Sequence, residues 1–318
     1  MRVGFIGLGN VGGKLAGSLL RNGFDLTVRD LDQEAARPFL EGGAKWADSP
    51  AEMAANVDYI ITCLPSPAAC AAVMEGEGGI LAGMRPGLIW AEMSTTDEAE
   101  VKRLGGLVAA QGGLPIDCPV SGGCHRAATG NIAIFAGCAR ETFEKALPVL
   151  TRLGRRVLHT GPLGSASVLK VMTNFLATTH LVALCEALTV MDQAGVDLGT
   201  TYEAIRISSG NSFVHETESQ MILNGCRDIN FTTDLVLKDI GLFQAIADRN
   251  GVPLEVNPMV IGIMQDTAAR YGERCQSDDV IRRLEEATGA DIRYPGFPSE
   301  MIDDEPEEQG YEGGRGTA

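Results

Sequence analysis

Lys170 and Asn174 interrupt an otherwise apolar stretch, VLKVMTNF, and their side chains could carry proton-transfer chemistry. The two residues are four positions apart, so on a helix they share one face. Lys170 is also the only formally charged residue between Arg156 and Glu186. A helix this apolar is normally buried, and a buried lysine is costly unless it is paired or used. Lys170 is therefore a candidate acid/base. The alternative is a lysine that snorkels to the surface at a helix start.

Three glycines near the N-terminus have the spacing of a dinucleotide-binding turn. Gly7, Gly9 and Gly12 follow the strand pattern RVGFI and open the helical pattern KLAGSLLRNG. Such glycines allow a tight turn, close approach of the backbone to a pyrophosphate, and close packing of helix on strand. The helix N-terminus then faces the phosphates with free N–H groups. The spacing predicts a dinucleotide site. A glycine-rich turn without a ligand is the alternative.

Carboxylates after the second strand pattern favour NAD over NADP. Asp30 ends the strand DLTVRD, eighteen residues after Gly12, where it would accept hydrogen bonds from the adenosine ribose hydroxyls. Asp30 and Asp32 would repel a 2′-phosphate, whereas NADP-binding proteins commonly place an arginine here. Arg29 precedes Asp30, and strand alternation should turn it to the opposite face.

Further strand patterns predict that the α/β arrangement continues to about residue 161. The patterns cover residues 57–65, 87–95, 114–121, 131–137 and 155–161. In open α/β sheets, ligands lie beyond the carboxyl ends of the strands. Leu64–Pro65, Ser94–Thr95 and Ser121–Gly123 stand at such ends. We therefore expect these three segments to share a site, although each could be ordinary turn chemistry.

The composition changes at GPLGSA, residues 161–166, and the chain then becomes almost wholly helical in pattern. The predicted fold class is α/β: a Rossmann-type doubly wound domain over residues 1–164, followed by an all-helical domain over residues 165–290. The remaining residues, 291–318, are acidic and lack a core-forming pattern. We expect this extension to be largely disordered.

Composition excludes several classes of partner. The net charge of −16 argues against nucleic acid and against an anionic membrane. No run of eighteen apolar residues lacks a polar break, so no membrane span is expected. The N-terminus leads directly into a strand, so we expect no signal peptide. The eight cysteines form no C-x-x-C pair and no histidine cluster has metal spacing, which indicates reduced thiols, no metal and a cytoplasmic location.

Four ordered segments carry a family resemblance over roughly residues 1–287. They are FIGLGNVGGKLAGSLL, DCPVSGG, GSASVLKVMTNF and NFTTDLVLKDIGL. Together they resemble the N-terminal signature, substrate loop, catalytic helix and nicotinamide-side segment of the β-hydroxyacid dehydrogenases. That family includes 3-hydroxyisobutyrate dehydrogenase and tartronate semialdehyde reductase. Val11 stands where the family usually has methionine, and Ala166 and Ser167 stand where small residues or glycine are common.

The resemblance implies a reaction and a role for each matching residue. Lys170 would be the catalytic acid/base and Asn174 would position the substrate, a small hydroxyacid or the corresponding semialdehyde. Ser121, Gly122 and Gly123 would bind the substrate carboxylate, and Phe231 would lie near the substrate. The implied cofactor-binding residues are Gly7, Leu8, Gly9, Asn10, Val11, Gly12, Asp30, Leu64, Pro65, Thr95 and Lys238. The resemblance also implies a homodimer or homotetramer built through the helical domain.

One departure from the family pattern bears on the substrate. After Gly123, where small residues are usual, this chain has Cys124, His125 and Arg126. His125 and Arg126 could simply point to the surface. Alternatively, Arg126 adds a cation for a second anionic group, because a guanidinium suits a carboxylate or sulfonate. The substrate would then be a dicarboxylic hydroxyacid or a sulfonated analogue rather than 3-hydroxyisobutyrate, the family default. His125 could titrate near neutral pH.

Two other functions fit parts of the pattern. Imine reductases share a similar fold, but they generally replace the lysine that this chain has at Lys170. A non-catalytic dinucleotide-binding interaction module would have lost the catalytic lysine or asparagine, or gained a reader domain. The sequence keeps both Lys170 and Asn174 and shows no added domain. These features favour the dehydrogenase.

Overall fold

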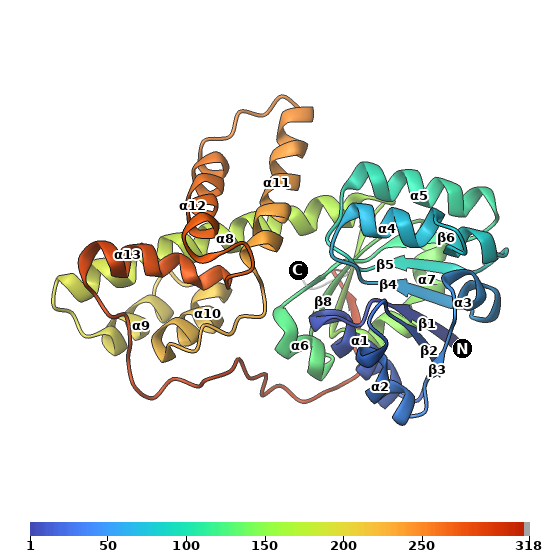
Figure 1. The fold of residues 1–318 in the computed structure, drawn as a ribbon, viewed down its shortest axis with the longest axis horizontal. Coiled ribbons are helices and arrows are strands. Elements are labelled where there is room, and N and C mark those ends of the chain that lie inside the picture. Colours follow the sequence, from blue (N-terminus) through green and yellow to red (C-terminus); the bar gives the residue numbers. More distant parts are fainter. Residues whose placement is uncertain (315–318) are drawn as a thin grey trace. The chain divides into compact units, whose positions relative to one another are not determined.

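The computed structural model describes residues 1–314 and forms two compact units (Figure 1). Unit 1 comprises Met1–Lys170 and the C-terminal segment from Asp303 onward, and unit 2 comprises Val171–Ile302. The predicted fold class, a Rossmann-type doubly wound domain followed by an all-helical domain, is confirmed. The division falls at Lys170, inside a long helix, whereas the sequence placed it at residue 164.

Unit 1 is built on one sheet. Its strands are β1 (Arg2–Ile6), β2 (Asp25–Arg29), β3 (Lys45–Trp46), β4 (Tyr59–Thr62), β5 (Ile89–Glu92), β6 (Leu114–Asp117), β7 (Val120–Ser121), β8 (Ala133–Gly137), β9 (Arg156–Gly161) and β10 (Tyr311–Gly313). They lie in the order β10-β9-β8-β6-β5-β4-β1-β2-β3, with β7 paired to β8. Neighbours are parallel except where β8 meets β6 and β7. The chain winds outward from β1 in both directions, so the switch point lies between β1 and β4.

Helices cover both faces of this sheet. They are α1 (Asn10–Arg21), α2 (Gln33–Glu41), α3 (Pro50–Asn56), α4 (Pro67–Glu75), α5 (Glu98–Ala110), α6 (Gly123–Thr129) and α7 (Arg140–Leu153), with a 3₁₀ turn η1 (Ile80–Gly83). Strand alternation divides the core: Phe5 and Tyr59 pack with α1, α2, α6 and α7. Ile60 and Trp90 pack on the other face with α3, α4 and α5. A sheet buried on both faces explains the near-continuous apolar strands.

Unit 2 is helical. Its elements are α8 (Ser165–Gln193), which begins in unit 1, then α9 (Leu198–Arg206), α10 (Phe213–Asn224), α11 (Thr233–Arg249), α12 (Val256–Tyr271), the 3₁₀ turn η2 (Ser277–Ile281) and α13 (Arg282–Thr288). Leu188 of α8, Ile222 of α10 and Ile240 of α11 are fully buried in one shared core. Phe175 of α8 stacks on Phe243 of α11, with ring centroids 4.6 Å apart.

By length and composition alone, α8 could cross a membrane. An 18-residue window of this helix has a mean hydropathy of 1.4, and 39% of the window is buried inside the structure. The sequence predicted no membrane span because Lys170 and Asn174 interrupt the apolar run. Leu181, Cys185 and Leu188 of α8 belong to the core of unit 2. A core helix of a helical domain passes the same test of composition, so the finding is weak evidence for a membrane span.

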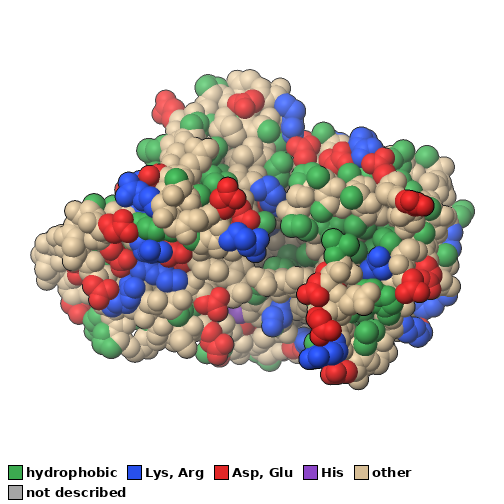
Figure 2. Space-filling model, in the orientation of Figure 1, with side chains coloured by type: hydrophobic (Ala, Val, Ile, Leu, Met, Phe, Trp, Pro, Cys, Tyr) green, Lys and Arg blue, Asp and Glu red, His purple; other side chains and the backbone are tan. Residues whose placement is uncertain are grey.

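The C-terminal segment corrects a sequence-based expectation. Residues 291–318 were expected to be largely disordered, yet residues 303–314 run along unit 1 and end in β10, which pairs in parallel with β9. Their carboxylates meet basic side chains: Glu307 lies 3.4 Å from Arg21, and Glu312 lies 2.6 Å from Arg140. Acidic and basic side chains are mixed on the face that Figure 2 shows. Composition alone could not reveal these complementary cations, so the disorder prediction is wrong for residues 303–314.

Candidate active site

The glycine turn connects β1 to α1, and its glycines differ in what they allow. A Cβ on Gly7, whose φ is +98°, would lie 2.2 Å from the carbonyl oxygen of Cys63. A Cβ on Gly12 would lie 2.1 Å from the carbonyl oxygen of Gly7. These two glycines are required by the turn itself. At Gly9, however, a Cβ would meet nothing within 4 Å, which leaves space for a ligand against the backbone.

Asp30 is fixed against this turn. Its carboxylate accepts the backbone N–H of Leu8 at 2.5 Å and that of Asp32 at 2.9 Å. A carboxylate offers about four lone pairs, so Asp30 can still accept hydroxyl groups. Arg29 is engaged elsewhere: its guanidinium donates to the carbonyl oxygens of Ala47, at 2.9 Å, and Asp48, at 2.7 Å. The predicted acid therefore reaches the turn, and the neighbouring arginine is held by the segment after β3.

Hydrogen bonds join the carboxyl ends of β4 and β5. The backbone N–H of Leu64 donates to Oγ of Ser94 at 2.7 Å. The carboxylate of Glu92, only 1% exposed, accepts from Oγ1 of Thr62 and from the backbone N–H of Ser94, both at 2.8 Å. Burial raises the pKa of Glu92. The structure thus brings together the predicted segments Leu64–Pro65 and Ser94–Thr95. Sequence reasoning missed Glu92, although an acid inside the strand GLIWAEMST was a signal.

The predicted substrate loop carries His125 and Arg126 directly over its glycines. Gly122 has a φ of +131°, and a Cβ there would lie 3.3 Å from Cδ of Arg126. Gly123 has a φ of +85°, and its Cβ would lie 2.9 Å from Cε1 of His125. The aliphatic stem and the imidazole therefore lie beside the loop backbone. Ser121 ends β7 next to them and is half-buried. Both side chains are half-buried, and 33% of the Arg126 side chain is exposed, so the surface-pointing alternative stays open.

The surroundings of His125 favour its neutral form. Burial lowers its pKa from the usual 6.5, and the positive charge of Arg126 lowers it further, although Asp303 opposes the shift. Its Nδ1 atom is buried and has no hydrogen-bond partner within residues 1–314. Titration near neutrality, which the sequence allowed, is therefore displaced to more acidic pH. Arg126 lies 3.4 Å from the carboxylate of Glu305.

Asp117, at the end of β6, holds the first turn of α8. Its Oδ1 atom accepts the backbone N–H of Gly164 at 2.8 Å, and its Oδ2 atom accepts the backbone N–H and Oγ of Ser167 at 2.8 and 3.0 Å. Asp117 is fully buried, and burial raises its pKa. The residue therefore links the predicted substrate loop, which begins four positions later, to the helix that carries Lys170. The motif DCPVSGG contained Asp117, but the partners of its carboxylate could not be predicted.

Lys170 is buried, with 8% of its surface exposed, so the snorkelling alternative is wrong. One helical turn later, Nδ2 of Asn174 donates to Oδ2 of Asp239 at 2.5 Å. The other oxygen of Asp239 lies 3.0 Å from Nζ of Lys238. Asp239 is 2% exposed and joins the predicted substrate residue Asn174 to the predicted cofactor residue Lys238. Sequence reasoning missed Asp239, although an acid next to a lysine inside an apolar helix was a signal.

The remaining predictions divide between the units. Asn174, Phe231 and Lys238 belong to unit 2, and the other predicted site residues belong to unit 1, which ends its main segment at Lys170. Phe231 packs against the core of unit 2, and its place near a substrate stays a prediction. Within residues 1–314, no group of three or more His, Cys, Asp or Glu side chains is arranged to hold a metal ion.

Comparisons with known proteins agree with this geometry. Residues 2–161 match the family model described as the NAD binding domain of 6-phosphogluconate dehydrogenase. Residues 164–284 match the model for the NAD-binding domain of NADP-dependent 3-hydroxyisobutyrate dehydrogenase. The chain is also 32% identical to the mitochondrial 3-hydroxyisobutyrate dehydrogenase of Mus musculus, over 89% of this chain and 87% of the mouse protein. The chain belongs to the β-hydroxyacid dehydrogenase family.

Relatives within the β-hydroxyacid dehydrogenases differ in the substrates their names state. The 2-(hydroxymethyl)glutarate dehydrogenase of Eubacterium barkeri is 31% identical, over 92% of this chain and 97% of its own length. A solved 3-hydroxyisobutyrate dehydrogenase from Salmonella typhimurium superposes with a TM-score of 0.81 and 27% identity, covering 89% of this chain and 99% of its own. An imine reductase from Myxococcus stipitatus, 17% identical with a TM-score of 0.61, shows only that the fold is shared. The chain is thus an NAD(P)-dependent oxidoreductase of the β-hydroxyacid dehydrogenase family.

Proposed function

We propose that this enzyme oxidises a small β-hydroxyacid with NAD, using Lys170 as the general acid/base. The observation that carries the proposal is a buried amine one helical turn from Asn174, whose amide is itself held by a buried carboxylate. A dehydrogenase has a use for such an amine, because oxidation of an alcohol releases a proton as well as a hydride.

In the proposed chemistry, a side chain of this protein accepts the proton that the substrate hydroxyl releases. A bound nicotinamide supplies the hydride acceptor. Lys170, as the free amine, takes the proton of the substrate hydroxyl, and in the reverse direction its ammonium returns a proton to the carbonyl oxygen of a semialdehyde. Asn174 positions the substrate beside it. Nδ2 of Asn174 donates to Asp239, and the amide oxygen would accept a hydrogen bond from the substrate hydroxyl.

The cofactor residues suit NAD. The backbone of Gly7–Gly12, including Leu8, Asn10 and Val11, would hold the pyrophosphate, and the open space at Gly9 supports this assignment. Asp30 would accept the ribose hydroxyls and repel a 2′-phosphate. Arg29 already donates to two carbonyl groups, which reduces its use as a phosphate ligand. Leu64, Pro65, Thr95 and Lys238 complete the proposed set.

The substrate is proposed to carry two anionic groups. Ser121, Gly122 and Gly123 would bind the carboxylate next to the reacting alcohol. Arg126 would bind a second carboxylate or a sulfonate, because its stem lies beside Gly122 and a guanidinium binds such groups through paired hydrogen bonds. A relative named for a dicarboxylic hydroxyacid, 2-(hydroxymethyl)glutarate, supports this choice.

The test is NADH or NADPH production from three alcohols. These are 3-hydroxyisobutyrate, 2-(hydroxymethyl)glutarate and a sulfonated three-carbon alcohol. Wild type should prefer NAD and a dianion. Arg126→Ala should raise KM for the dianions by about ten-fold or more, the scale of a lost charge-assisted hydrogen bond, and leave the monoanion unchanged. Arg21→Ala, which removes another cation of unit 1, is the matched control. Equal losses for monoanion and dianion would refute the second-anion assignment.

Assembly and location complete the proposal. We propose a cytoplasmic homodimer or homotetramer, with no nucleic acid or membrane partner. Eight free cysteines in the described residues are consistent with a reducing compartment. Light scattering of the purified protein at two concentrations would measure the oligomer, and a monomer at both would contradict the proposal.

A further inference from the structure

Residues 303–314, here called the acidic strap, are anchored beside the substrate loop. Asn131, 5% exposed, donates from Nδ2 to the carboxylate of Asp303 and to the backbone oxygen of Glu305, both at 2.8 Å. Oγ1 of Thr129 also hydrogen-bonds to Asp303. Both donors lie within five residues after Arg126 in the chain. The backbone of the strap at Glu305 is therefore fixed close to the loop by a buried amide.

The strap is anchored a second time at its other end. Tyr311–Gly313 forms β10, which pairs in register with Arg156–Leu158 of β9. The guanidinium of Arg140 donates two hydrogen bonds, of 2.6 and 2.9 Å, to the carboxylate of Glu312. The Glu312 side chain is only 18% exposed. Bidentate, half-buried pairs of this kind are the strong ones. The strap is thus held in place whether or not the Glu305 carboxylate contacts Arg126.

The carboxylate of Glu305 is the loosely held group between these anchors. It lies 3.4 Å from the guanidinium of Arg126, and its side chain is 60% exposed. An exposed ion pair stabilises little, because water and salt screen it and two long side chains must be ordered. Arg126 is also the residue whose stem covers Gly122. An internal carboxylate therefore contacts the cation beside the loop, and a ligand anion can displace it.

We propose that Glu305 is a specificity-determining residue that competes with the second anionic group of the substrate for Arg126. This inference rests on the proposed function, since it assumes that anions bind at the loop. A monoanion leaves the Arg126–Glu305 pair intact. A dianion must displace the Glu305 carboxylate, which stays nearby because the strap backbone is anchored, and its charge then repels the ligand. Glu305 therefore reduces the preference for dianions that Arg126 creates.

The experiment measures competitive inhibition by two unreactive probes, glutarate with two carboxylates and butyrate with one. The assay uses whichever hydroxyacid the full-length wild type oxidises fastest. Glu305→Gln should lower the inhibition constant of glutarate roughly two- to five-fold, the factor that corresponds to an exposed ion pair. It should leave that of butyrate unchanged. Glu308→Gln, which removes another strap carboxylate that pairs with Arg155 instead, is the matched control and should change neither constant.

A double-mutant cycle separates a direct effect from a structural one. In an Arg126→Ala background, Glu305→Gln should have no further effect on glutarate. An unchanged ratio of the two inhibition constants in Glu305→Gln, or a gain that persists without Arg126, would overturn the inference. If Arg126→Ala still weakens dianions in that case, the proposed function stands and only the role of Glu305 falls. If the wild type oxidises no hydroxyacid with NAD or NADP, the proposed function itself fails.

Discussion

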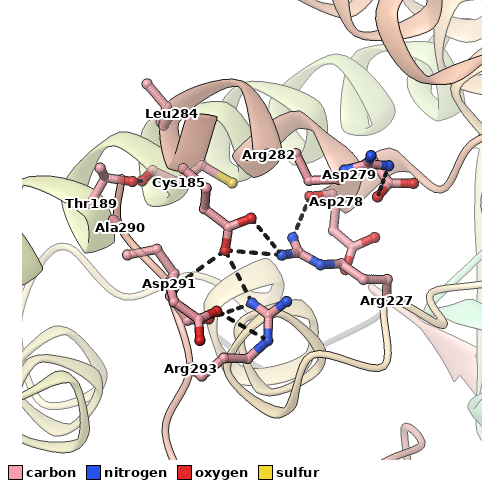
Figure 3. A network of polar contacts seen from close by, with 12 residues as sticks. Cys185, Thr189, Arg227, Asp278, Asp279, Arg282, Leu284, Ala290, Asp291 and Arg293 are labelled. Carbon is pink, nitrogen blue, oxygen red and sulfur yellow. Dashed lines mark hydrogen bonds and ion pairs between the residues drawn. The ribbon is translucent and has the colours of Figure 1, made fainter. Parts of the chain in front are cut away.

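Two regions of this molecule bury carboxylates in opposite ways. Asp117 accepts three hydrogen bonds from the start of α8, just before Lys170 in the chain. Asp239 accepts a hydrogen bond from Asn174, one turn after Lys170 on α8, and lies beside Lys238. At η2, Asp278 is just as buried, yet neither of its carboxylate oxygens has a hydrogen-bond partner within residues 1–314. Figure 3 shows Arg227 directed to this turn, where its guanidinium donates to the backbone oxygen of Asp278 at 3.2 Å.

The difference indicates what each buried acid does. Hydrogen bonds stabilise a buried carboxylate in its charged form and fix its neighbours in one geometry. The acids beside α8 therefore fix the position of the groups that contact them, which include the proposed site residues Asn174 and Lys238. Burial without such partners favours the neutral acid, and it raises the pKa of Asp278 to about 7. The pKa of Glu218, on α10, is raised to about 8 by burial and by the charge of Asp278. Burial raises the pKa of Asp117 as well, but the hydrogen bonds from Gly164 and Ser167 oppose that shift. The region at η2 should therefore respond more to pH, and the region at α8 more to loss of geometry.

The largest expected effect comes from the residue that the α8 carboxylates flank. Lys170→Ala should lower turnover by roughly 10²–10⁴-fold, the range for loss of a general acid/base. The affinity for NAD should remain nearly unchanged, because the proposed cofactor contacts lie elsewhere. Turnover is measured by NADH absorbance and affinity by fluorescence titration. Turnover near the wild-type level would show that Lys170 is not the acid/base. The carboxylates beside α8 would then have no catalytic lysine to position.

The second effect tests Asp239 as a positioning residue. Asp239→Asn keeps the shape of the side chain but replaces one acceptor by a donor, which would face Lys238 or Asn174. We expect kcat to fall by about ten-fold, the cost of one spoiled buried hydrogen bond. Asp266→Asn, at an exposed ion pair of the same unit, should have little effect. An unchanged kcat in Asp239→Asn would mean that Asn174 does not depend on this carboxylate.

A smaller effect is expected at Asp30, a carboxylate held by two backbone N–H groups. Asp30→Ala should lower the affinity for NAD several-fold, the net contribution of a typical hydrogen bond, and narrow the preference for NAD over NADP. A competition titration with both cofactors measures the ratio. Asp25→Ala, which removes an exposed carboxylate from the start of β2, is the control. The same preference in wild type and Asp30→Ala would exclude Asp30 as a ribose ligand.

The smallest effect concerns stability at η2. The pKa of Asp278 is raised from 3.8 when unfolded to about 7 when folded, so the folded state binds more protons between these values. This stabilisation is complete below about pH 4 and is lost as the pH rises through 7. The asparagine side chain of Asp278→Asn is neutral at every pH, so this variant should not lose stability as the pH rises through 7. Its Tm should exceed that of wild type by about 2–5 °C at pH 8 and match it near pH 4.

Asp291→Asn, at an exposed position, provides the control for this stability series. A wild-type Tm that does not fall between pH 5 and pH 8 relative to Asp278→Asn would show that Asp278 is ionised in the folded protein. The contrast between the two regions would then disappear.

Sequence alone was sufficient where the signal is local. The glycine spacing, the positions of the longer strands along the chain and the position of Lys170 in an apolar helix all follow from neighbouring residues. The partners of Asp117, Asp239 and Glu305 lie far away in the chain: Asn174 and Asp239 are 65 residues apart, and Arg126 and Glu305 are 179 apart. No period or motif connects such pairs. The same limit made the acidic strap resemble a disordered tail, because the cations that order it belong to other elements.

The most direct test of proton transfer by Lys170 is the variant Lys170→Arg. An arginine keeps the positive charge and most of the length, but it does not lose its proton in proteins, so it cannot act as a base. We predict that Lys170→Arg oxidises the hydroxyacid as slowly as Lys170→Ala, within about ten-fold, while it still binds NAD. A rate close to that of wild type would show that only the charge is needed, and it would contradict proton transfer to Lys170.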